Sequence, residues 1–413
     1  MKLVLIRLLT FLLTIYIASI IIFKQYYFNV PHIIDMALIT VFFILMLLER
    51  ETTYKINIII ILYALFIVVS LASSLWGVGF NNPSYKALQL FLILMNMFII
   101  YNIVKKYNLV NTFFNGILLG ALINYIILLG IIQVPFDIYM GVGAGARAVG
   151  TMGNPNILTT AMLISMLVSM VYLFKEQRMS KLFYYYQFIN IFLAMYIIVL
   201  TVSKKGIILG LLLFLMYLIL LLKSKKGIFQ IGMLAIFAVI IGQFFIDLSE
   251  LYSVLEYVER RFEDFSTGIS SLSTSATSST AIRKELIEFG LVAFQSNPLF
   301  GYGLDNFRVL TTGQYAHNNP VELLVGVGLI GTILYYGIHV SLLKKIYEMK
   351  ASELKYLLYF FVVCILLMDL TTVSYGTKLM MFSILYMYIF AESETLDLSF
   401  TTTGKLNKDS EET

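Results

Sequence analysis

Long uninterrupted apolar runs constrain this chain more than any other feature. A helix needs ~20 mostly apolar residues to cross the hydrocarbon core of a bilayer. The runs of about that length are 3–23, 31–48, 56–75, 87–104, 111–134, 155–174, 184–202, 206–222, 227–247, 320–343, 354–371 and 375–391. They are rich in Leu and Ile and lack the two-residue alternation of barrel strands. The chain is 60% hydrophobic and 13% charged, a composition far too apolar for an ordinary soluble domain. We therefore predict an all-α polytopic membrane protein with about 12 transmembrane helices.

The basic residues indicate an orientation. With the N-terminus inside, most of the 29 Lys and Arg residues fall in the inner segments, as the positive-inside rule requires. The runs then form a single membrane domain, 1–391, with both termini cytoplasmic and a polar tail, 392–413, that we expect to be disordered. Basic inner loops explain the net charge of +5 without a nucleic-acid partner. The single cysteine permits no internal disulfide and suits neither a zinc site nor a redox pair.

One loop, 248–319, is much longer than the others and is predicted to lie outside. Its beginning and the stretch 281–298 carry apolar residues at helical spacing, which predicts amphipathic helices. A Ser- and Thr-rich stretch, 266–280, lies between them and is typical of a flexible hinge. Loops of this length are usually functional or disordered. The helical patterns favour function, so we expect an extracytoplasmic catalytic loop.

The stretch "GQYAHNNPVELL" places a histidine directly before an apolar run. Asn319 is predicted to cap this helix, with Glu322 completing a capping box. That pattern leaves His317 unexplained. The positive end of a helix disfavours a protonated imidazole, and a neutral imidazole is what a general base needs near pH 7. His317 is therefore the candidate base, and His32, at another outer helix start, is its rival.

Two further outer helix starts show similar chemistry. Asn154 is placed to cap one run, with Arg147 just upstream, and Lys204 and Lys205 open another. Helix N-termini beside Arg and Lys bind anions, most often phosphate. The outer face has no ATP supply, so we expect a lipid-linked phosphate or pyrophosphate. The alternative is that these cations only extend toward lipid headgroups.

Three stretches together resemble the O-antigen ligase and Wzy-type polymerase superfamily: "RAVGTMGNPN", "TVSKKG" and "IRKELIEFGLVAFQSNPLFGYGLDNF…AHNNPVELLVGVGLIG". The third is the most specific. It combines an Arg-led amphipathic helix, a P-x-x-G-x-G turn and an HN pair before a helix with G-x-x-G. The resemblance implies a GT-C-like architecture and the transfer of glycans from undecaprenyl pyrophosphate at the outer face of a bacterial cell membrane. It also implies inversion at the anomeric carbon, with no cofactor and no metal.

The resemblance assigns roles to residues of this chain. It implies that His317 activates an acceptor hydroxyl and that Arg147 and Arg283 hold the pyrophosphate. Lys204 takes the place of the family's usual arginine. The full predicted pyrophosphate-binding set is Arg147, Lys204, Lys205, Arg283 and Arg308. The predicted supporting residues are Asn154, Asn318, Asn319 and Glu322.

We predict a polymerase that joins undecaprenyl-pyrophosphate-linked oligosaccharide repeats into a capsular or O-antigen-type surface polysaccharide. An O-antigen ligase-type transfer to another glycan acceptor is the alternative within the same chemistry. A transporter or flippase is the alternative of another class, although such proteins tend to carry ionisable residues deep in their helices. The expected partners are the lipid-linked donor, a glycan acceptor and the bilayer, together with a chain-length regulator and a separate flippase.

Overall fold

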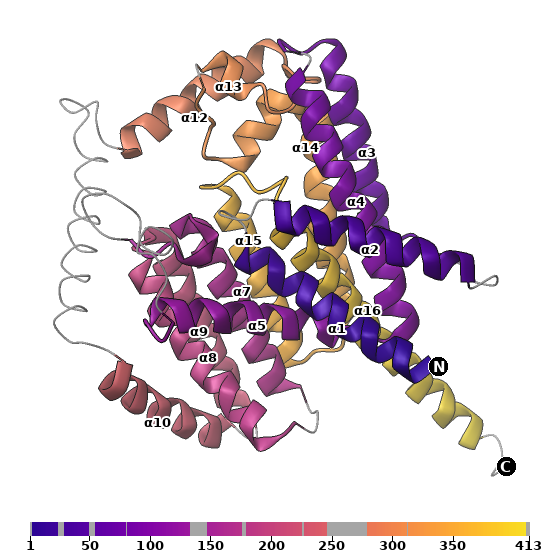
Figure 1. The fold of residues 1–413 in the computed structure, drawn as a ribbon, viewed down its shortest axis with the longest axis vertical. Coiled ribbons are helices and arrows are strands. Elements are labelled where there is room, and N and C mark those ends of the chain that lie inside the picture. Colours follow the sequence, from indigo (N-terminus) through magenta and orange to yellow (C-terminus); the bar gives the residue numbers. More distant parts are fainter. Residues whose placement is uncertain are drawn as a thin grey trace. The chain divides into compact units, whose positions relative to one another are not determined.

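Helices account for the secondary structure of the computed structural model, apart from turns and short 3-10 segments in the part described (Figure 1). The described residues are 2–23, 29–48, 54–79, 81–132, 147–175, 179–224, 227–245, 279–311 and 313–409. The amphipathic helix predicted at the start of the 248–319 loop lies outside these residues, as does all but the end of the Ser- and Thr-rich stretch.

The chain forms two compact units. The single membrane domain over 1–391 stays a prediction. Unit 1 comprises Met1–Thr40 with Asn111–Glu285, and unit 2 comprises Val41–Val110 with Leu286–Thr413. Helices α2 (Asn29–Leu48) and α12 (Ser279–Ser296) each cross from one range to the other. The other elements of unit 1 are α1 (Lys2–Ile22), α5 (Asn111–Leu128), η2 (Gly150–Met152), α7 (Pro155–Phe174), α8 (Lys181–Leu200), α9 (Lys204–Lys223) and α10 (Gly227–Phe245). Those of unit 2 are α3 (Ile58–Ala72), η1 (Ser73–Leu75), α4 (Asn81–Tyr107), α13 (Phe307–Leu310), α14 (Asn319–Tyr347), α15 (Glu353–Asp369) and α16 (Lys378–Asp409).

Each predicted apolar run overlaps a helix, although α5 ends at Leu128, before the end of its run. Eight helices of the described chain are long and apolar enough to cross a membrane, namely those at Leu3–Ile22, Ile58–Leu75, Asn82–Tyr107, Asn111–Leu128, Pro155–Phe174, Lys181–Leu200, Lys204–Lys223 and Asn319–Tyr347. The chain is therefore a polytopic integral membrane protein. The full number of twelve spans and the GT-C-like arrangement stay predictions.

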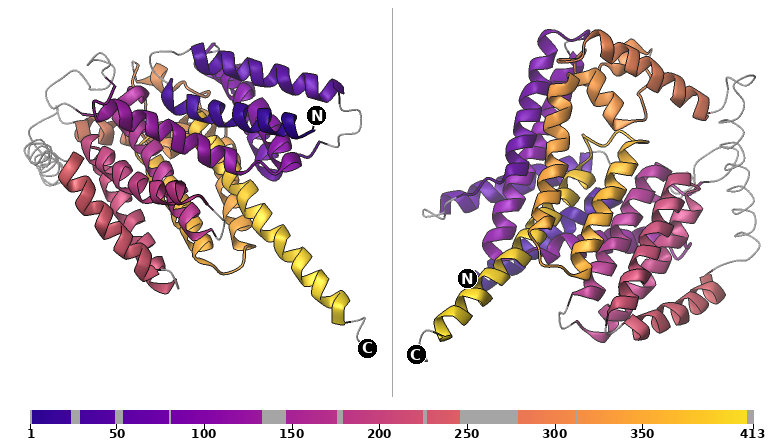
Figure 2. Two further views of the ribbon diagram at one scale, coloured as in Figure 1. Left: turned by 60° about the horizontal axis from the view of Figure 1, so that its bottom comes forward. Right: turned by 180° about the vertical axis from the view of Figure 1, so that it is seen from behind.

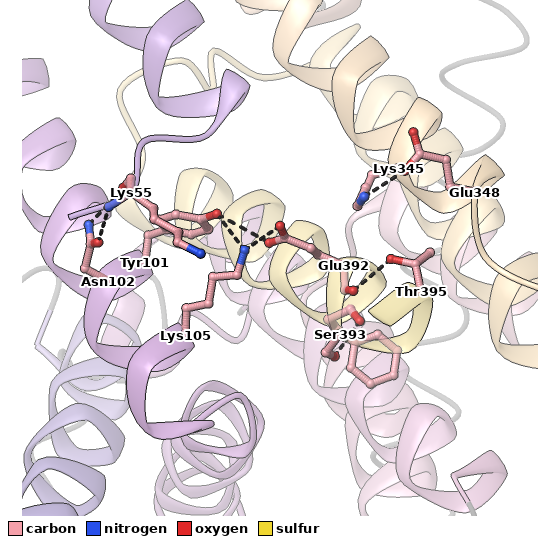
Figure 3. A network of polar contacts seen from close by, with 10 residues as sticks. Lys55, Tyr101, Asn102, Lys105, Lys345, Glu348, Glu392, Ser393 and Thr395 are labelled. Atoms are coloured by element: carbon pink, nitrogen blue, oxygen red, sulfur yellow. Dashed lines mark hydrogen bonds and ion pairs between the residues drawn. The ribbon is translucent and has the colours of Figure 1, made fainter. Parts of the chain in front are cut away.

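Helix α16 is longer than its predicted span. It continues from Lys378 to Asp409, into the polar segment for which the sequence predicts disorder (Figure 2). Glu392 stands at the point where the predicted span ends, and it is held by Lys105 of α4 (Figure 3). That ion pair joins α16 to α4 at the end of the predicted span.

One end of unit 2 brings basic residues that the sequence places in inner segments together with Tyr101 and Asn102 from the end of a predicted span. Lys105 donates to Glu392 and, at 3.2 Å, to the hydroxyl of Tyr101. Asn102 joins the same helix to the segment before α3, because its Oδ1 accepts from the Lys55 backbone N–H at 2.8 Å. Figure 3 shows these groups together with a further ion pair between Lys345 and Glu348. Their common location agrees with the alternating direction of the helices in the predicted topology.

Helix α14 is broken rather than straight. Gly328 has φ 63° and ψ −165°, which no right-handed helix contains. Asn319 and Tyr336 are separated by 17 residues, or about 25 Å in a continuous helix. Yet the Asn319 Nδ2 lies 3.2 Å from the Tyr336 hydroxyl. The chain therefore reverses at Gly328, and the segment 319–327 folds back beside the segment 329–347. The expectation of one uninterrupted helix over 320–343 is wrong at this point.

The reversal leaves carbonyl groups at the end of the first segment without helical partners, and the turn 298–303 satisfies them. The backbone N–H of Tyr302 donates to the Val325 carbonyl at 2.7 Å, and that of Gly303 donates to the Gly326 carbonyl at 2.8 Å. Buried backbone groups without partners are costly. The P-x-x-G-x-G motif thus serves as a cap for the broken helix.

The same turn also caps the beginning of the second segment. The Leu329 N–H donates to the Pro298 carbonyl at 2.8 Å. This contact leaves no space for side chains, because a Cβ on Gly328 would lie 2.3 Å from the Leu299 carbonyl oxygen. A Cβ on Gly301 would lie 2.5 Å from a carbonyl oxygen of the first segment. Glycine is required at both positions by positive φ and by close backbone approach.

We predict that Gly328→Ala lowers the stability of the folded protein by at least about 2 kcal/mol, because strained backbone and steric overlap add together. The measurement is the thermal midpoint of the purified protein in detergent. Gly232→Ala is the matched control, since Gly232 lies in α10 with no heavy atom within 4 Å of a built Cβ. That change should be neutral or stabilise by about 0.5–1 kcal/mol. Equal midpoints for the two variants would contradict the role of the reversal.

Candidate functional site

In unit 1, the N-terminus of α7 has the predicted cap. The Asn154 side chain accepts hydrogen bonds from the backbone N–H groups of Asn156, at 2.9 Å, and Ile157, at 3.3 Å. Pro155 follows as the first helical residue, where its missing N–H costs nothing. The prediction for Asn154 is confirmed.

The N-terminus of α9 lies beside that of α7. The Ser203 hydroxyl donates to Asn156 Oδ1 at 3.0 Å, and the hydroxyls of Thr159 and Thr201 lie 2.8 Å apart. A Cβ on Gly206 would lie 2.1 Å from Thr159 Cγ2, so the backbone of α9 packs directly against the Thr159 side chain of α7. Two helix N-termini therefore share one corner, and the partial positive charges of both favour an anion there.

Arg147 reaches the turn that leads into α9. Its Nε donates to the Thr201 carbonyl at 2.8 Å, and its Nη2 donates to the Val202 carbonyl at 3.4 Å. Ala148 strengthens this attachment, because its N–H donates to the Leu200 carbonyl at 3.0 Å. Lys204 follows this turn directly. The structure thus brings Arg147 to the same corner as Lys204, as the sequence predicts.

The turn itself is strained. Val202 has φ 48°, although β-branched residues strongly disfavour the left-handed region. Such a conformation costs on the order of 1–3 kcal/mol and persists only where the surroundings enforce it. Val202 is buried, as are Thr201 and Ser203 on either side. The start of α9, with Lys204 and Lys205, is therefore held in a defined orientation.

In unit 2, the cap of α14 differs from the prediction by one residue. Asn318, not Asn319, is the N-cap, and its Oδ1 accepts from the Val321 N–H at 3.0 Å. The Asn318 Nδ2 donates to the Leu370 carbonyl at 3.0 Å, which joins this helix start to the end of α15. His317 thus immediately precedes the cap. It has φ 51°, a half-buried side chain, and a ring centroid 4.0 Å from that of Tyr315.

The predicted capping box is wrong. With Asn318 as the cap, Glu322 lies one residue beyond the position that a capping box requires. Its carboxylate instead accepts from the backbone N–H of Ala316 at 2.9 Å. Glu322 is buried, and this bond ties the chain just before His317 to the first turn of α14. The residue supports the position of the histidine, but by a different contact.

Arg308 is paired with a carboxylate of its own segment. It forms an ion pair with Asp305, three residues earlier, and Asp305 has φ 65°. Partial burial works against the charge of Arg308, but the Asp305 carboxylate outweighs that effect and raises the pKa of the guanidinium above its usual value. Arg308 is therefore a permanent cation whose charge is partly compensated within unit 2.

Lys86 is a residue that the site assignment from sequence missed. It lies in the second turn of α4, with its ammonium nitrogen 5.4 Å from the centre of the Tyr375 ring. It is within electrostatic reach of Asp305, Arg308 and Glu322. A lysine just inside an outer helix start, against the positive-inside bias, is the sequence signal that could have identified it.

Asn319 is buried and links three parts of unit 2. Its Nδ2 donates to the Asp369 carboxylate at 3.2 Å and to the Tyr336 hydroxyl, and its Oδ1 accepts from the N–H groups of Ser374, at 3.0 Å, and Tyr375, at 3.2 Å. Asp369 also accepts from the Ser374 hydroxyl. The network holds the start of α14 against the end of α15 and against the turn that carries Tyr375 beside Lys86.

Arg283 lies on the packed side of α12. Leu286 and Gly290 are buried on that side, and Arg283 precedes them at helical spacing. Leu286 belongs to an apolar cluster with Phe307 and Val325, which fixes this helix against α13 and α14. The described ranges contain no group of three or more His, Cys, Asp or Glu residues able to hold a metal ion. His32, the rival histidine, lies in the first turn of α2.

The predicted site residues thus fall into groups that are each organised locally. The corner in unit 1 contains Arg147, Asn154, Lys204 and Lys205. The cluster in unit 2 contains Lys86, Asp305, Arg308, His317, Asn318, Asn319 and Glu322. The first group is basic and stands at helix N-termini. The second places a histidine between buried polar supports.

Comparison with known proteins gives one family match over part of the chain. Residues 189–336 match the family model described as O-antigen ligase. This region carries the O-antigen ligase domain, and the predicted resemblance to the O-antigen ligase and Wzy-type superfamily is confirmed. The match includes Lys204, Arg283 and His317, whereas Arg147 lies before it. The curated proteins contain no significant match to the chain.

The two adjacent asparagines should respond differently to substitution. Asn318→Ala removes a helix cap and should cost about 0.5–2 kcal/mol of stability. Asn319→Ala removes the acceptor of two buried backbone N–H groups, those of Ser374 and Tyr375, each worth about 1–3 kcal/mol, so its effect should be clearly larger. Thermal midpoints of the two variants in detergent give the comparison. A larger loss for Asn318→Ala would contradict the greater contribution assigned to the buried contacts of Asn319.

Proposed function

We propose that the protein is a glycosyltransferase that polymerises undecaprenyl-pyrophosphate-linked oligosaccharide repeats at the outer face of a bacterial cell membrane. The family match implies ligase- or polymerase-type activity on a lipid-linked glycan in general. The observation that carries the proposal further is the shared corner of the α7 and α9 N-termini, with Lys204, Lys205 and Arg147 beside it. Such a corner suits the pyrophosphate of the donor.

In this mechanism, Lys204, Lys205 and Arg283 neutralise the pyrophosphate, and Arg308 adds a further cation. His317 takes the proton from a sugar hydroxyl of the acceptor, and that oxygen attacks the anomeric carbon with inversion. The bond to the pyrophosphate oxygen breaks, and undecaprenyl pyrophosphate leaves. Positioned charge on a leaving anion is a large catalytic contribution, about 2.7–4 kcal/mol per donor in comparable sites.

Polymerase and ligase activity differ only in the acceptor. A polymerase uses a second lipid-linked repeat, whereas a ligase uses another glycan acceptor. Purified protein given a defined lipid-linked repeat as its sole glycan substrate distinguishes them. A ladder of products indicates polymerase, and transfer only after addition of a different acceptor indicates the ligase. Movement of the intact donor across vesicles without any transfer would instead favour a flippase.

We predict that His317→Ala keeps the protein's fold and membrane level but loses transfer by about 10²–10⁴-fold, the usual contribution of a general base. His32→Ala is the matched control and should stay active. The measurement is product formed per folded enzyme. Loss in His32→Ala with activity kept in His317→Ala would move the base to the other histidine. Activity in both would leave Glu322 or Asp305 as the base, or no protein base at all.

We predict that Arg283→Ala sharply reduces transfer and that Arg283→Lys is impaired too, because an ammonium lacks the planar fork of a guanidinium. Lys204→Arg should be tolerated, since it restores the residue that is usual in the family. Initial rates at saturating and limiting donor separate kcat from KM for each variant. Full activity of Arg283→Ala at normal expression would remove Arg283 from the mechanism.

A further inference from the structure

We propose that Arg147 acts as a positioning residue, which holds the strained turn at Val202 and thereby sets the direction in which α9 presents Lys204. This inference rests on the proposed function, because Lys204 is taken to meet the pyrophosphate. It assigns Arg147 a role different from direct contact with that anion. The resemblance implies direct contact, whereas the contacts in unit 1 indicate action through the protein backbone.

The first evidence is the direction of the guanidinium donors. Nε donates to the Thr201 carbonyl at 2.8 Å, and Nη2 donates to the Val202 carbonyl at 3.4 Å. Thr201 is the C-cap of α8, so its carbonyl is among those that a helix end leaves without helical partners. A planar guanidinium can serve two neighbouring carbonyls at once. Arg147 thus meets a need that the end of α8 creates.

The second evidence is the backbone conformation between those carbonyls and Lys204. Val202 is β-branched, 2% exposed and has φ 48°. Strain of this kind survives only where the surroundings over-determine the geometry. Arg147 binds the carbonyls of Thr201 and Val202, which belong to the two peptide units that flank the Val202 Cα. The Thr159 and Thr201 hydroxyls hold the turn against α7. Removing Arg147 takes away a direct restraint on the strained residue.

The consequence lies one residue further along. Ser203 begins α9 as its N-cap, but its side chain makes no capping bond and is directed to Asn156 instead. The first turn of α9 therefore depends on the preceding turn for its direction. If Val202 relaxes to an ordinary conformation, the chain enters α9 at a different angle and Lys204 moves away from the corner shared with α7.

The test is a double-mutant cycle between Arg147→Ala and Val202→Gly. Glycine adopts positive φ without strain, so it relieves the need for a restraint. We expect Arg147→Ala to lower kcat by more than about tenfold in the unaltered background. In the Val202→Gly background, the loss of kcat caused by Arg147→Ala should be smaller by a factor of at least about ten. Coupling of this kind is the signature of two groups that act on one element. Val202→Asn repeats the cycle with another residue that tolerates this region.

Lys204→Ala is the matched control. The Lys204 ammonium is proposed to contact the pyrophosphate directly, so the loss of transfer caused by Lys204→Ala should be the same with and without Val202→Gly. An equal loss for Arg147→Ala in both backgrounds, or no loss at all, would overturn the positioning role and indicate direct contact or no contribution.

Hydrogen–deuterium exchange provides a readout that does not depend on transfer. Amides of residues 200–206 should exchange faster in Arg147→Ala than in the unaltered protein, and unchanged exchange would overturn the inference. Absence of any transfer by the unaltered protein would instead refute the proposed function, and the exchange result would still judge the role of Arg147.

Discussion

The backbone hydrogen bonds at Gly328 are the interaction on which unit 2 depends. A helix broken inside an apolar bundle exposes carbonyls on one side and N–H groups on the other, and no water is at hand to satisfy them. The turn 298–303 binds both sets, through Val325 and Gly326 on one side and Leu329 on the other. These hydrogen bonds offset the energetic cost of the reversal. The reversal places the start of α14 beside Asp369 rather than at the far end of a straight helix.

That arrangement gives the polar cluster its supports. Asn318 caps the returning segment, Asn319 joins it to Asp369, and Glu322 holds the backbone before His317. Each of these side chains is buried and has a partner, as low-dielectric surroundings require. The half-buried histidine thus follows a segment that buried hydrogen bonds hold in place, as a precisely positioned side chain requires.

Unit 1 meets a similar demand with a side chain. The end of α8 leaves carbonyls that Arg147 binds, and the start of α9 lies against α7 through hydroxyl contacts. In both units, therefore, the polar and charged side chains of the candidate site lie at the ends of helices. Helix ends supply unpaired backbone groups and partial charge, and in an apolar chain they are the places where polar side chains have a structural reason to be.

The sequence by itself determined the membrane class, the approximate positions of most helices and the cap at Asn154, because apolar length and cap residues act locally along the chain. Its motifs also showed the resemblance to the O-antigen ligase superfamily. It also identified the glycines of the P-x-x-G-x-G motif, but not their purpose. Only the tertiary structure decided that α14 reverses at Gly328, that Asn318 rather than Asn319 is the cap, and that Lys86 belongs to the cluster. These features depend on contacts between segments far apart in the sequence. The spacing of Asn319 and Glu322 also fits a capping box. In the folded protein, however, Asn319 binds Asp369 and Glu322 binds the Ala316 backbone N–H, so the box does not form.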